Sequence, residues 1–377
     1  MPKYKFSEIA YNINQKKIPE PGEEKMYIGL EHLDSGSLKV RRWGSDVPIT
    51  GEKLVMKKGD ILFGRRNTYL RRASIAPHDG IFSAHGMIFR PNTEVIDPDY
   101  FPFFISSDYF MNAAIRISVG SLSPTVNWKT LKELEFDIPD LDSQRKSADL
   151  LTAANKLKES YEALLEQTDQ LVKSQFIEMF GDPEVNKNNL PVATLKDICI
   201  GKLSYGSGAA AVDYDGVTRY VRITDITDTG ELSDDIKSPS VIDEKYLLNE
   251  GDILFARSGA TVGKTLLYRE KYGRCIYAGF LIRLIPNTAI VVPEYVFGFT
   301  KSAYYEEFVK KTQRAVGQPN INAQEYGDLK ICVPPIEQQK AFSKLLEQSD
   351  KSKFEIKKSI ENISDLIKSL LQQDFNI

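Results

Sequence analysis

The chain of 377 residues is long enough for two or three domains, and an apolar content of 42% is enough for ordinary cores. Its three cysteines and three histidines are scattered and include no C-x-x-C pair, which argues against a zinc site or a disulfide framework and favours a reducing, cytoplasmic setting. No apolar run approaches about 18 residues, so neither a membrane span nor a signal peptide is expected, and the net charge of −3 gives no overall attraction to nucleic acid.

Residues 1–139 are predicted to form a strand-rich globular head. Short β-branched and aromatic runs such as Ile61-Leu62-Phe63 alternate with Gly, Pro, Asn and Asp, which is typical of short strands joined by turns. Between Lys39 and Arg72, ten basic residues stand against three acidic ones, a local balance of +7. Such a patch in a protein of negative net charge indicates a phosphate-binding surface, and the alternative is a solvated charged surface.

Residues 140–182 are predicted to form a long helix. The segment 140–180 contains no glycine, its apolar residues recur every three or four positions, and Gly181 is a suitable stop. Asp140 and Asp142 lie in the first turn, where the helix dipole favours acidic side chains. The repeat is typical of a coiled-coil seam. The predicted seam consists of Leu150, Ala154, Leu157, Tyr161, Leu164 and Leu171.

Residues 183–334 are predicted to form a second strand-rich head, because they repeat the first about 195 residues later. Gly-Asp-Ile-Leu-Phe at 59–63 returns at 251–255, and Pro139 followed by Gln144 returns as Pro334 followed by Gln339. A period this long exceeds the roughly 20 to 50 residues of solenoid units. It indicates a duplicated α+β module with an internal pseudo-two-fold axis and two similar binding faces.

Residues 335–377 are predicted to form a second long helix with the same seam pattern. Its seam consists of Leu345, Ile356, Ile360, Ile363, Ile367 and Leu370. If a two-fold axis relates the two modules, the helices meet as an antiparallel coiled coil that holds the heads at a fixed separation. The alternative is that each helix only caps its own head.

The order head, long helix, head, long helix, with Pro and then Gln opening each helix, resembles the specificity subunit of Type I restriction-modification systems. Local sequence matches support the resemblance, which covers essentially the whole chain, at 58–63, 173–183, 250–259 and 317–322. It implies a non-catalytic subunit in which each head is a target recognition domain that reads one half of a split, asymmetric DNA site. It also implies that the helices set the unread gap and dock two adenine methyltransferase subunits, which carry S-adenosylmethionine, with restriction subunits as further partners.

The candidate DNA-binding residues are basic, aromatic and polar side chains in the loops of the two heads. Arginine grips guanine O6 and N7, and an aromatic ring can lie against sugar or an unstacked base. In the first head the candidates are Arg41, Arg42, Trp43, Arg65, Arg66, Tyr69, Arg71 and Arg72. In the second head, which is nearly neutral, they are Tyr205, Ser207, Arg257, Ser258, Lys264, Arg274, Arg314 and Gln318. For each residue of the second head taken individually, the sequence favours a plain loop residue over a base reader.

Two other functions were weighed against DNA recognition. The segment Ser258–Thr265 nearly spells a phosphate-binding P-loop, but Ser258 replaces the first glycine and Leu266-Leu267 predicts a strand where a helix is needed. A β-turn between two strands is the better interpretation. The alternative function for the whole chain is a duplicated hydrolase or transferase whose helices serve dimerisation, although no metal-binding, nucleotide-binding or triad motif supports it.

Overall fold

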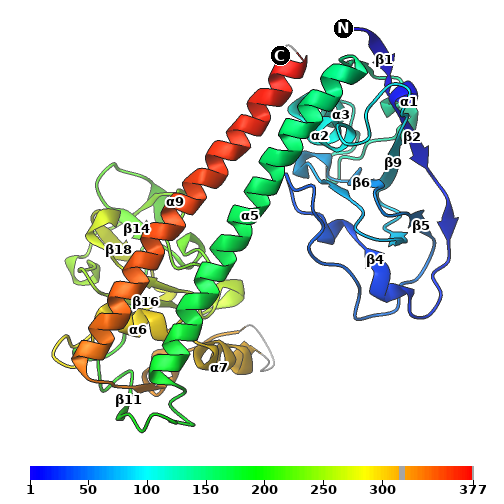
Figure 1. Ribbon diagram of the computed structural model, residues 1–377. Coiled ribbons are helices and arrows are strands. Elements are labelled where there is room, and N and C mark those ends of the chain that lie inside the picture. Colours follow the sequence, from blue (N-terminus) through cyan, green and yellow to red (C-terminus); the bar gives the residue numbers. More distant parts are fainter. Residues whose placement is uncertain (314–318, 376–377) are drawn as a thin grey trace. The chain divides into compact units, whose positions relative to one another are not determined.

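The chain divides into two compact units, each built from one head and parts of both long helices. A computed structural model describes residues 1–313 and 319–375 (Figure 1). Unit 1 comprises Met1–Glu162 with Lys357–Ile377, and unit 2 comprises Ala163–Ile356. Head 1 denotes residues 1–139, drawn in blue to green-cyan, and head 2 denotes residues 183–334, drawn in green to orange. The prediction of two heads that each contain strands and helices is confirmed.

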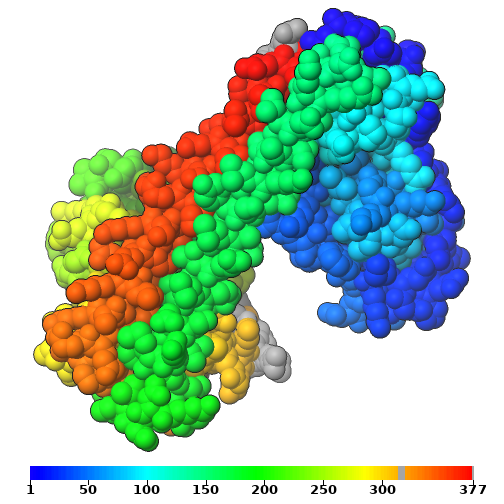
Figure 2. All heavy atoms as spheres, viewed as in Figure 1, coloured from blue at the N-terminus to red at the C-terminus, as the bar shows by residue number. Residues whose placement is uncertain are grey.

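The two long helices occupy the predicted segments. Helix α5 (Leu141–Phe180) and helix α9 (Ile336–Phe375) have 40 residues each, and α9 begins and ends 195 positions after α5. Within unit 1, the first part of α5 lies directly against the cyan surface of head 1 (Figure 2). Within the described part of the chain, none of the helices has the length and apolar character needed to cross a membrane.

Head 1 contains two four-stranded sheets and a short closing pair. The first sheet has the order β2-β9-β6-β7, the second has the order β3-β5-β8-β4, and β1 pairs with β10. In the second sheet β4 runs parallel to β8, whereas the remaining pairs are antiparallel. The strands are β1 (Lys3–Lys5), β2 (Ala10–Ile13), β3 (Lys16–Lys17), β4 (Tyr27–Ile28), β5 (Lys53–Met56), β6 (Ile61–Phe63), β7 (Ala73–Ile75), β8 (Gly80–Phe82), β9 (Met87–Pro91) and β10 (Glu135–Asp137). The helices are α1 (Phe6–Ile9), α2 (Phe101–Ser106), α3 (Asp108–Arg116) and α4 (Trp128–Leu131).

Head 2 has a counterpart for each strand of head 1, but the counterpart of the second sheet consists of two separate strand pairs. Its main sheet has the order β12-β19-β16-β17, β14 runs parallel to β18, and the pairs β13-β15 and β11-β20 are antiparallel. The strands are β11 (Val192–Thr194), β12 (Ser204–Tyr205), β13 (Ala211–Asp213), β14 (Arg219–Val221), β15 (Lys237–Pro239), β16 (Ile253–Ala256), β17 (Thr265–Leu267), β18 (Cys275–Tyr277), β19 (Leu281–Leu284) and β20 (Lys330–Cys332). The helices are α6 (Pro293–Phe299), α7 (Ala303–Gln313) and α8 (Ala323–Gly327).

The repeated Gly-Asp-Ile-Leu-Phe motif forms the central strand of each main sheet. Its aspartate is buried and bound to an arginine of the neighbouring strand: Asp60 accepts from Arg90 at 3.0 Å, and Asp252 pairs with Arg283. In both copies the same carboxylate also accepts a backbone N–H three residues earlier, which closes the turn before the strand. Each motif is therefore explained by the architecture of its own head.

A buried glutamine fixes the start of each long helix to its head. The side chain of Gln144 accepts from the N–H of Asp97 at 2.7 Å and donates to the carbonyl oxygens of Val95 and Pro139 at 3.0 and 2.8 Å. Gln339 makes the same three bonds to Val292, Ile290 and Pro334. Both glutamines are 0% exposed. The Pro-then-Gln pattern that opens both helices is thus a joint between helix and head.

Each head core is completed by the beginning of one long helix and the end of the other. In unit 1, Ala148 and Leu151 of α5 and Leu371 and Phe375 of α9 join the core of head 1. The ring of Phe375 stacks on Tyr109 with 4.8 Å between centroids. In unit 2 the helical contribution to the core of head 2 comes from Val172, Phe176, Phe180, Phe342 and Leu346.

The predicted seam positions of α9 are buried or partly buried, whereas the predicted leucines of α5 are exposed. Ile356 and Ile363 of α9 are buried, and Leu345, Ile360, Ile367 and Leu370 are partly buried. Ala154 and Tyr161 of α5 are also partly buried. In contrast, Leu150, Leu157, Leu164 and Leu171 are 44 to 59% exposed. The inward face of α5 lies one position further on, where polar residues such as Asn155, Glu162 and Asp169 contribute contacts that an apolar pattern cannot reveal.

Candidate nucleic-acid interface

Three of the six candidate arginines of head 1 are paired with carboxylates that lie outside Lys39–Arg72. Arg41 pairs with Glu162 of α5, and this pair ties the loop of head 1 to the helix within unit 1. The guanidinium of Arg42 donates two hydrogen bonds of 2.8 and 3.1 Å to Asp34, and these bonds lower the pKa of the Asp34 carboxyl. The local balance of +7 therefore overstates the charge that is available to a phosphate backbone. The pairs are Arg41 with Glu162, Arg42 with Asp34, and Arg71 with Asp108.

The other candidates of head 1 are concentrated on the turn that follows β6. No ion pair joins Arg65, Arg66 or Arg72 to a carboxylate in the described part of the chain. Tyr69 is 57% exposed on this turn, which Asn67 enters with a positive φ of 55°. Trp43 lies elsewhere, 46% exposed with its ring edge against His78. The segment between β6 and β7 thus carries three arginines without an ion pair to the described residues and one exposed aromatic ring.

A second loop, residues 118–126, braces this turn and escaped the sequence analysis. The N–H of Val126 donates to the carbonyl of Arg65 at 2.9 Å, and Arg66 Nε donates to Ser123 Oγ at 2.8 Å. Val119 and Thr125 exchange two backbone hydrogen bonds of 3.0 Å, which makes the loop a small closed hairpin. Its tip residue Leu122 is 96% exposed. The sequence contains one indication of this loop, because the segment around Pro319-Asn320 holds the equivalent place in the second copy.

In head 2 the equivalent pair of segments presents a stacked arginine. The guanidinium of Arg257 lies over the ring of Tyr205, 4.7 Å from its centroid, and Arg257 Nε donates to Asn320 Oδ1 at 3.2 Å. Ser258 forms a backbone bridge with Asn320, and the N–H of Ile321 donates to the carbonyl of Arg257 at 2.8 Å, as Val126 does to Arg65 in head 1. Tyr205, Arg257 and Ser258 are therefore brought together, and Asn320 joins them.

Three further candidates of head 2, Ser207, Lys264 and Arg274, make other contacts. Ser207 is 6% exposed, and its hydroxyl accepts from the N–H of Ala209, so burial excludes it from contact with a base in this conformation. Lys264 pairs with Asp228 at 2.8 Å, and Arg274 pairs with Glu244. Arg314 and Gln318 lie outside the described residues.

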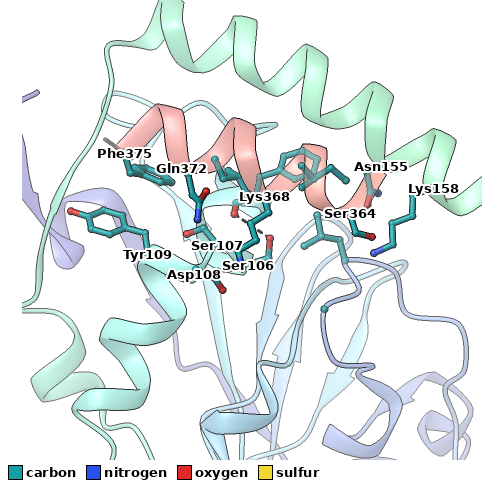
Figure 3. Close-up of a pocket in the computed structure, with 15 residues that line it drawn as sticks. Ser106, Ser107, Asp108, Tyr109, Asn155, Lys158, Ser364, Lys368, Gln372 and Phe375 are labelled. Carbon is teal, nitrogen blue, oxygen red and sulfur yellow. Dashed lines mark hydrogen bonds and ion pairs between the residues drawn. The ribbon is translucent and has the colours of Figure 1, made fainter. Parts of the chain in front are cut away.

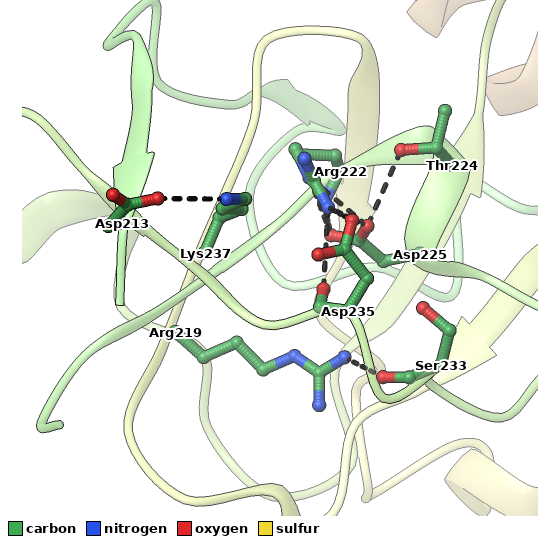
Figure 4. Close-up of polar contacts among 8 residues, drawn as sticks. All are labelled: Asp213, Arg219, Arg222, Thr224, Asp225, Ser233, Asp235 and Lys237. Atoms are coloured by element: carbon green, nitrogen blue, oxygen red, sulfur yellow. Dashed lines mark hydrogen bonds and ion pairs between the residues drawn. The ribbon is translucent and has the colours of Figure 1, made fainter. Parts of the chain in front are cut away.

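Several strong charges of head 2 are satisfied inside the head (Figure 4). Arg222 donates to Asp225 at 2.6 Å and to Asp235 at 2.8 Å, and these bonds raise its pKa. Asp225 is only 1% exposed. Lys237 pairs with Asp213 at 3.0 Å, and Arg219 donates to the carbonyl of Ser233. These contacts hold β14 and the following loops together, and they leave few basic groups of this region for a phosphate backbone.

The near-P-loop of head 2 is a turn between strands, as predicted. The segment after β16 makes one short 3₁₀ turn (Gly259–Thr261) and enters β17, which pairs antiparallel with β16. No helix start follows to face a phosphate. The three thiols of head 2 are not activated: burial raises the pKa of Cys275 to about 11 and also raises that of Cys199 and Cys332. In the described residues, no group of three or more His, Cys, Asp or Glu side chains is arranged to hold a metal ion.

Both copies of the repeat match the model of one protein family. The model of the Type I restriction modification DNA specificity domain matches residues 5–167 and 189–363. A provisionally assigned type I restriction enzyme specificity subunit, MjaX of Methanocaldococcus jannaschii, is 32% identical over 154 residues, 40% of this chain and 36% of its own length. The StySPI specificity subunit of Salmonella potsdam is 23% identical over 326 residues, 79% of this chain and 69% of its own length.

A solved structure shares the fold. The S subunit of a Type I restriction-modification system from M. genitalium superposes with a TM-score of 0.56 over 99% of this chain and 96% of its own, at 14% identity. The family match covers both heads and most of both long helices. The chain therefore belongs to the Type I restriction-modification DNA specificity family, with one specificity domain for each head and the helix that follows it.

Proposed function

We propose that the chain is the DNA-recognition subunit of a Type I restriction-modification complex and that each head reads one half of a bipartite, asymmetric site. The observation that carries the proposal is a shared framework with different exposed side chains. Arg65 and Arg257 hold equivalent places after β6 and β16, and their carbonyls accept from Val126 and Ile321. Around them head 1 presents Arg66, Tyr69 and Leu122, whereas head 2 presents Tyr205 and Asn320. Two frameworks with different contact groups suit two different half-sites.

In head 2, Arg257 and Asn320 are the proposed base readers. Arginine binds guanine O6 and N7, and asparagine binds adenine N6 and N7, each through two hydrogen bonds in the major groove. Stacking on Tyr205 restricts the guanidinium before DNA arrives, which lowers the entropy cost of ordering it. In head 1, Arg65, Arg66 and Arg72 are proposed to contact phosphates or bases.

Methyl transfer is proposed to come from two adenine methyltransferase subunits that supply S-adenosylmethionine, and a restriction subunit is a further proposed partner. The exposed leucines of α5 are the proposed docking positions. Leu150, Leu157, Leu164 and Leu171 recur every seven residues, so they share one side of the helix, and each is 44 to 59% exposed. Exposed apolar positions in a row are typical of a protein–protein interface.

The two long helices are proposed to pair antiparallel and to set the unread gap between the half-sites. Two contacts support this arrangement. In unit 1, Ser147 near the start of α5 donates to Asp374 near the end of α9 at 2.8 Å. In unit 2, Asp169 towards the end of α5 pairs with Lys353 in the first half of α9 at 3.1 Å.

An exchange of heads tests the proposal. Residues 1–139 are replaced by the first head of another family member, the complex is assembled with its methyltransferase, and methylated adenines are mapped by sequencing. We expect one half of the recognised site to change and the other half to persist. A change in both halves, or methylation of the original site alone, would contradict independent reading by two heads.

A further inference from the structure

A cavity in unit 1 lies where α2 and α3 of head 1 meet both long helices (Figure 3). It has a volume of about 250 Å³. Lys158 and Asn155 reach it from α5, Lys368 and Ser364 reach it from α9, and Ser106 reaches it from the end of α2. Apolar side chains line another part of the wall: Leu38, Phe103, Ile367, Leu371 and Phe375. Ser107, Asp108, Tyr109 and Gln372 also belong to the lining.

The cavity carries an excess of positive charge. Asp108 is the only acidic side chain among the residues that line it, and Lys368 and Arg71 share this carboxylate at 3.3 and 2.8 Å. Lys158 has no hydrogen bond or ion pair within the described residues. The neighbouring carboxylate of Glu159 is bound to Lys39 at 3.6 Å. The two lysines that line the cavity thus stand against one carboxylate, a balance of +1, and Arg71 shares that carboxylate from outside the lining.

The corresponding place in unit 2 holds the same lysines with their carboxylates. Because the helices are offset by 195 positions, Lys158 corresponds to Lys353 and Lys368 corresponds to Lys173. Lys353 pairs with Asp169 at 3.1 Å and with Asp350 at 2.9 Å, and Lys173 pairs with Glu306 at 2.7 Å. The two lysines of unit 2 are therefore neutralised by the protein itself.

Three substitutions convert this neutral cluster into the open cavity of unit 1. Asp350 and Asp169 are replaced by Asn155 and Ser364, which removes both partners of the lysine at position 158. Lys301, which lies near Lys353 and Lys173 in unit 2, is replaced by Ser106, which shortens the side chain at that point. Unit 1 keeps both helical lysines, and Lys368 keeps a carboxylate partner in Asp108, whereas Lys158 has no counterpart of Asp350 or Asp169 beside it.

We propose that this cavity is a binding site for a small organic anion, a molecule with a phosphate or carboxylate group and a short apolar part. The anionic group would lie between Lys158 and Lys368, with the second N–H of Asn155 as a further donor, because the first donates to Glu159. The hydroxyls of Ser364 and Ser106 donate to the carbonyl oxygens of Ile360 and Phe103 and would only lie beside the anion. The apolar part would lie against Phe103, Ile367 and Leu371. An anion there would supply the negative charge that Asp169 and Asp350 supply in unit 2, because charge-assisted bonds to a carboxylate or phosphate are the strong ones.

The shape of the site favours a small molecule over a DNA backbone. The volume is slightly below the roughly 300 to 1,000 Å³ of pockets for drug-sized ligands. Apolar rings form part of the wall, whereas a phosphate backbone is bound by exposed basic groups. The site is independent of the proposed DNA function, because it is defined by the cavity and by Lys158, which lacks the carboxylate partners that Lys353 has in unit 2.

Phenyl phosphate is a suitable probe because it joins an anion to one apolar ring. Binding to the full chain is measured by titration calorimetry up to about 10 mM, a range that detects even weak affinity. We expect binding of phenyl phosphate, weaker binding of inorganic phosphate, and no binding of phenol. Lys158→Gln is expected to lower the affinity at least about tenfold, the effect of losing one charge-assisted hydrogen bond.

A second variant restores the pattern of unit 2 without removing a lysine. Asn155→Asp with Ser364→Asp places carboxylates beside Lys158, as Asp350 and Asp169 do beside Lys353, and is expected to abolish binding in a folded protein. The matched control is Lys357→Gln with Lys358→Gln, which removes exposed charge from α9 away from the cavity and should leave binding unchanged. Absence of binding, equal binding by the variants, or displacement of phenyl phosphate by duplex DNA would each overturn a small-anion site.

Discussion

Replacing Gln339 with leucine should loosen head 2 from its helix. The substitution removes one acceptor and two donated bonds at a position that is 0% exposed. It orphans the N–H of Val292 and the carbonyl oxygens of Ile290 and Pro334. Each unsatisfied buried group costs about 1 to 3 kcal/mol, so the free energy of unfolding of unit 2 should fall by roughly 3 kcal/mol or more.

Amide hydrogen exchange measures this effect unit by unit. A loss of about 3 kcal/mol corresponds to exchange on the order of a hundredfold faster at amides that open only with unit 2, such as those of β16. The amides of β6 in unit 1 serve as the internal reference. Gln338→Leu is the matched control, because Gln338 is the exposed neighbour of Gln339. Gln144→Leu should produce the mirror result in unit 1.

Unchanged exchange at β16 in Gln339→Leu would refute the reasoning. It would mean that the three bonds are replaced by water or by a shift of the helix, and that the repeated glutamine does not hold the joint. Exchange that increases equally in both units would also contradict it, because the contacts of Gln339 lie within unit 2 alone.

Three further predictions concern charge, pH and spacing. Arg66→Glu should weaken DNA binding by the assembled complex and reduce its salt slope by about 0.9 for each lost phosphate contact, and an unchanged slope in a salt titration would place Arg66 away from DNA. Burial lowers the pKa of Lys301 to about 8 from 10.5, so the folded state binds fewer protons between these values and unit 2 should gain stability as pH rises through that window. Denaturation at several pH values should lose this gain in Lys301→Met and keep it in the exposed control Lys310→Met. Four residues inserted after Glu162, with four after Ile356, add roughly 6 Å of helix and should lengthen the unread gap by one or two base pairs. An unchanged gap in the mapped methylation site would show that the helices do not set the distance between the half-sites.

The sequence predicted the repeated framework well, because local signals determine it. The Gly-Asp-Ile-Leu-Phe motif combines a turn glycine with a fully apolar strand, and both copies became central strands. What the sequence could not show was the partner of the aspartate. Arg90 lies 30 positions after Asp60, and nothing in a linear pattern indicates that the two side chains meet.

The exposed leucines of α5 show why apolar spacing failed on one helix. Two stripes run along α5, one position apart, and both repeat every three or four residues. The stripe with more leucine is the exposed one, and the inward stripe uses Ala148, Leu151 and Val172 together with polar residues that bond to the heads or to α9. A buried helix face that contains ion pairs has charged residues at the helical repeat, so its sequence resembles that of a solvent-exposed face.

The charge count on head 1 failed for a related reason. A window from Lys39 to Arg72 contains its arginines but not Asp34, Asp108 or Glu162, which neutralise three of them from elsewhere in unit 1. Tertiary pairing therefore moved the candidate interface from a broad patch to the turn after β6. The bracing loop with Leu122 was missed because a polar, glycine-containing loop gives no sign of which segment it meets.

Duplication makes these differences interpretable, because each unit is a control for the other. Where both copies keep the same contact, as Gln144 and Gln339 do, the residue holds the fold. Where equivalent positions differ but the surrounding backbone hydrogen bonds are the same, the fold forms with either residue, so the difference is not needed for stability. The loops after β6 and β16 are of this second kind, and so are Asn155 and Ser364, which stand where unit 2 has carboxylates. A lysine that retains its position but loses its carboxylate costs stability unless another anion compensates, because an uncompensated charge beside apolar walls is unfavourable. Divergence at equivalent positions is therefore the basis on which we propose that the loops after β6 and β16 contact different half-sites and that the cavity of unit 1 binds an anion.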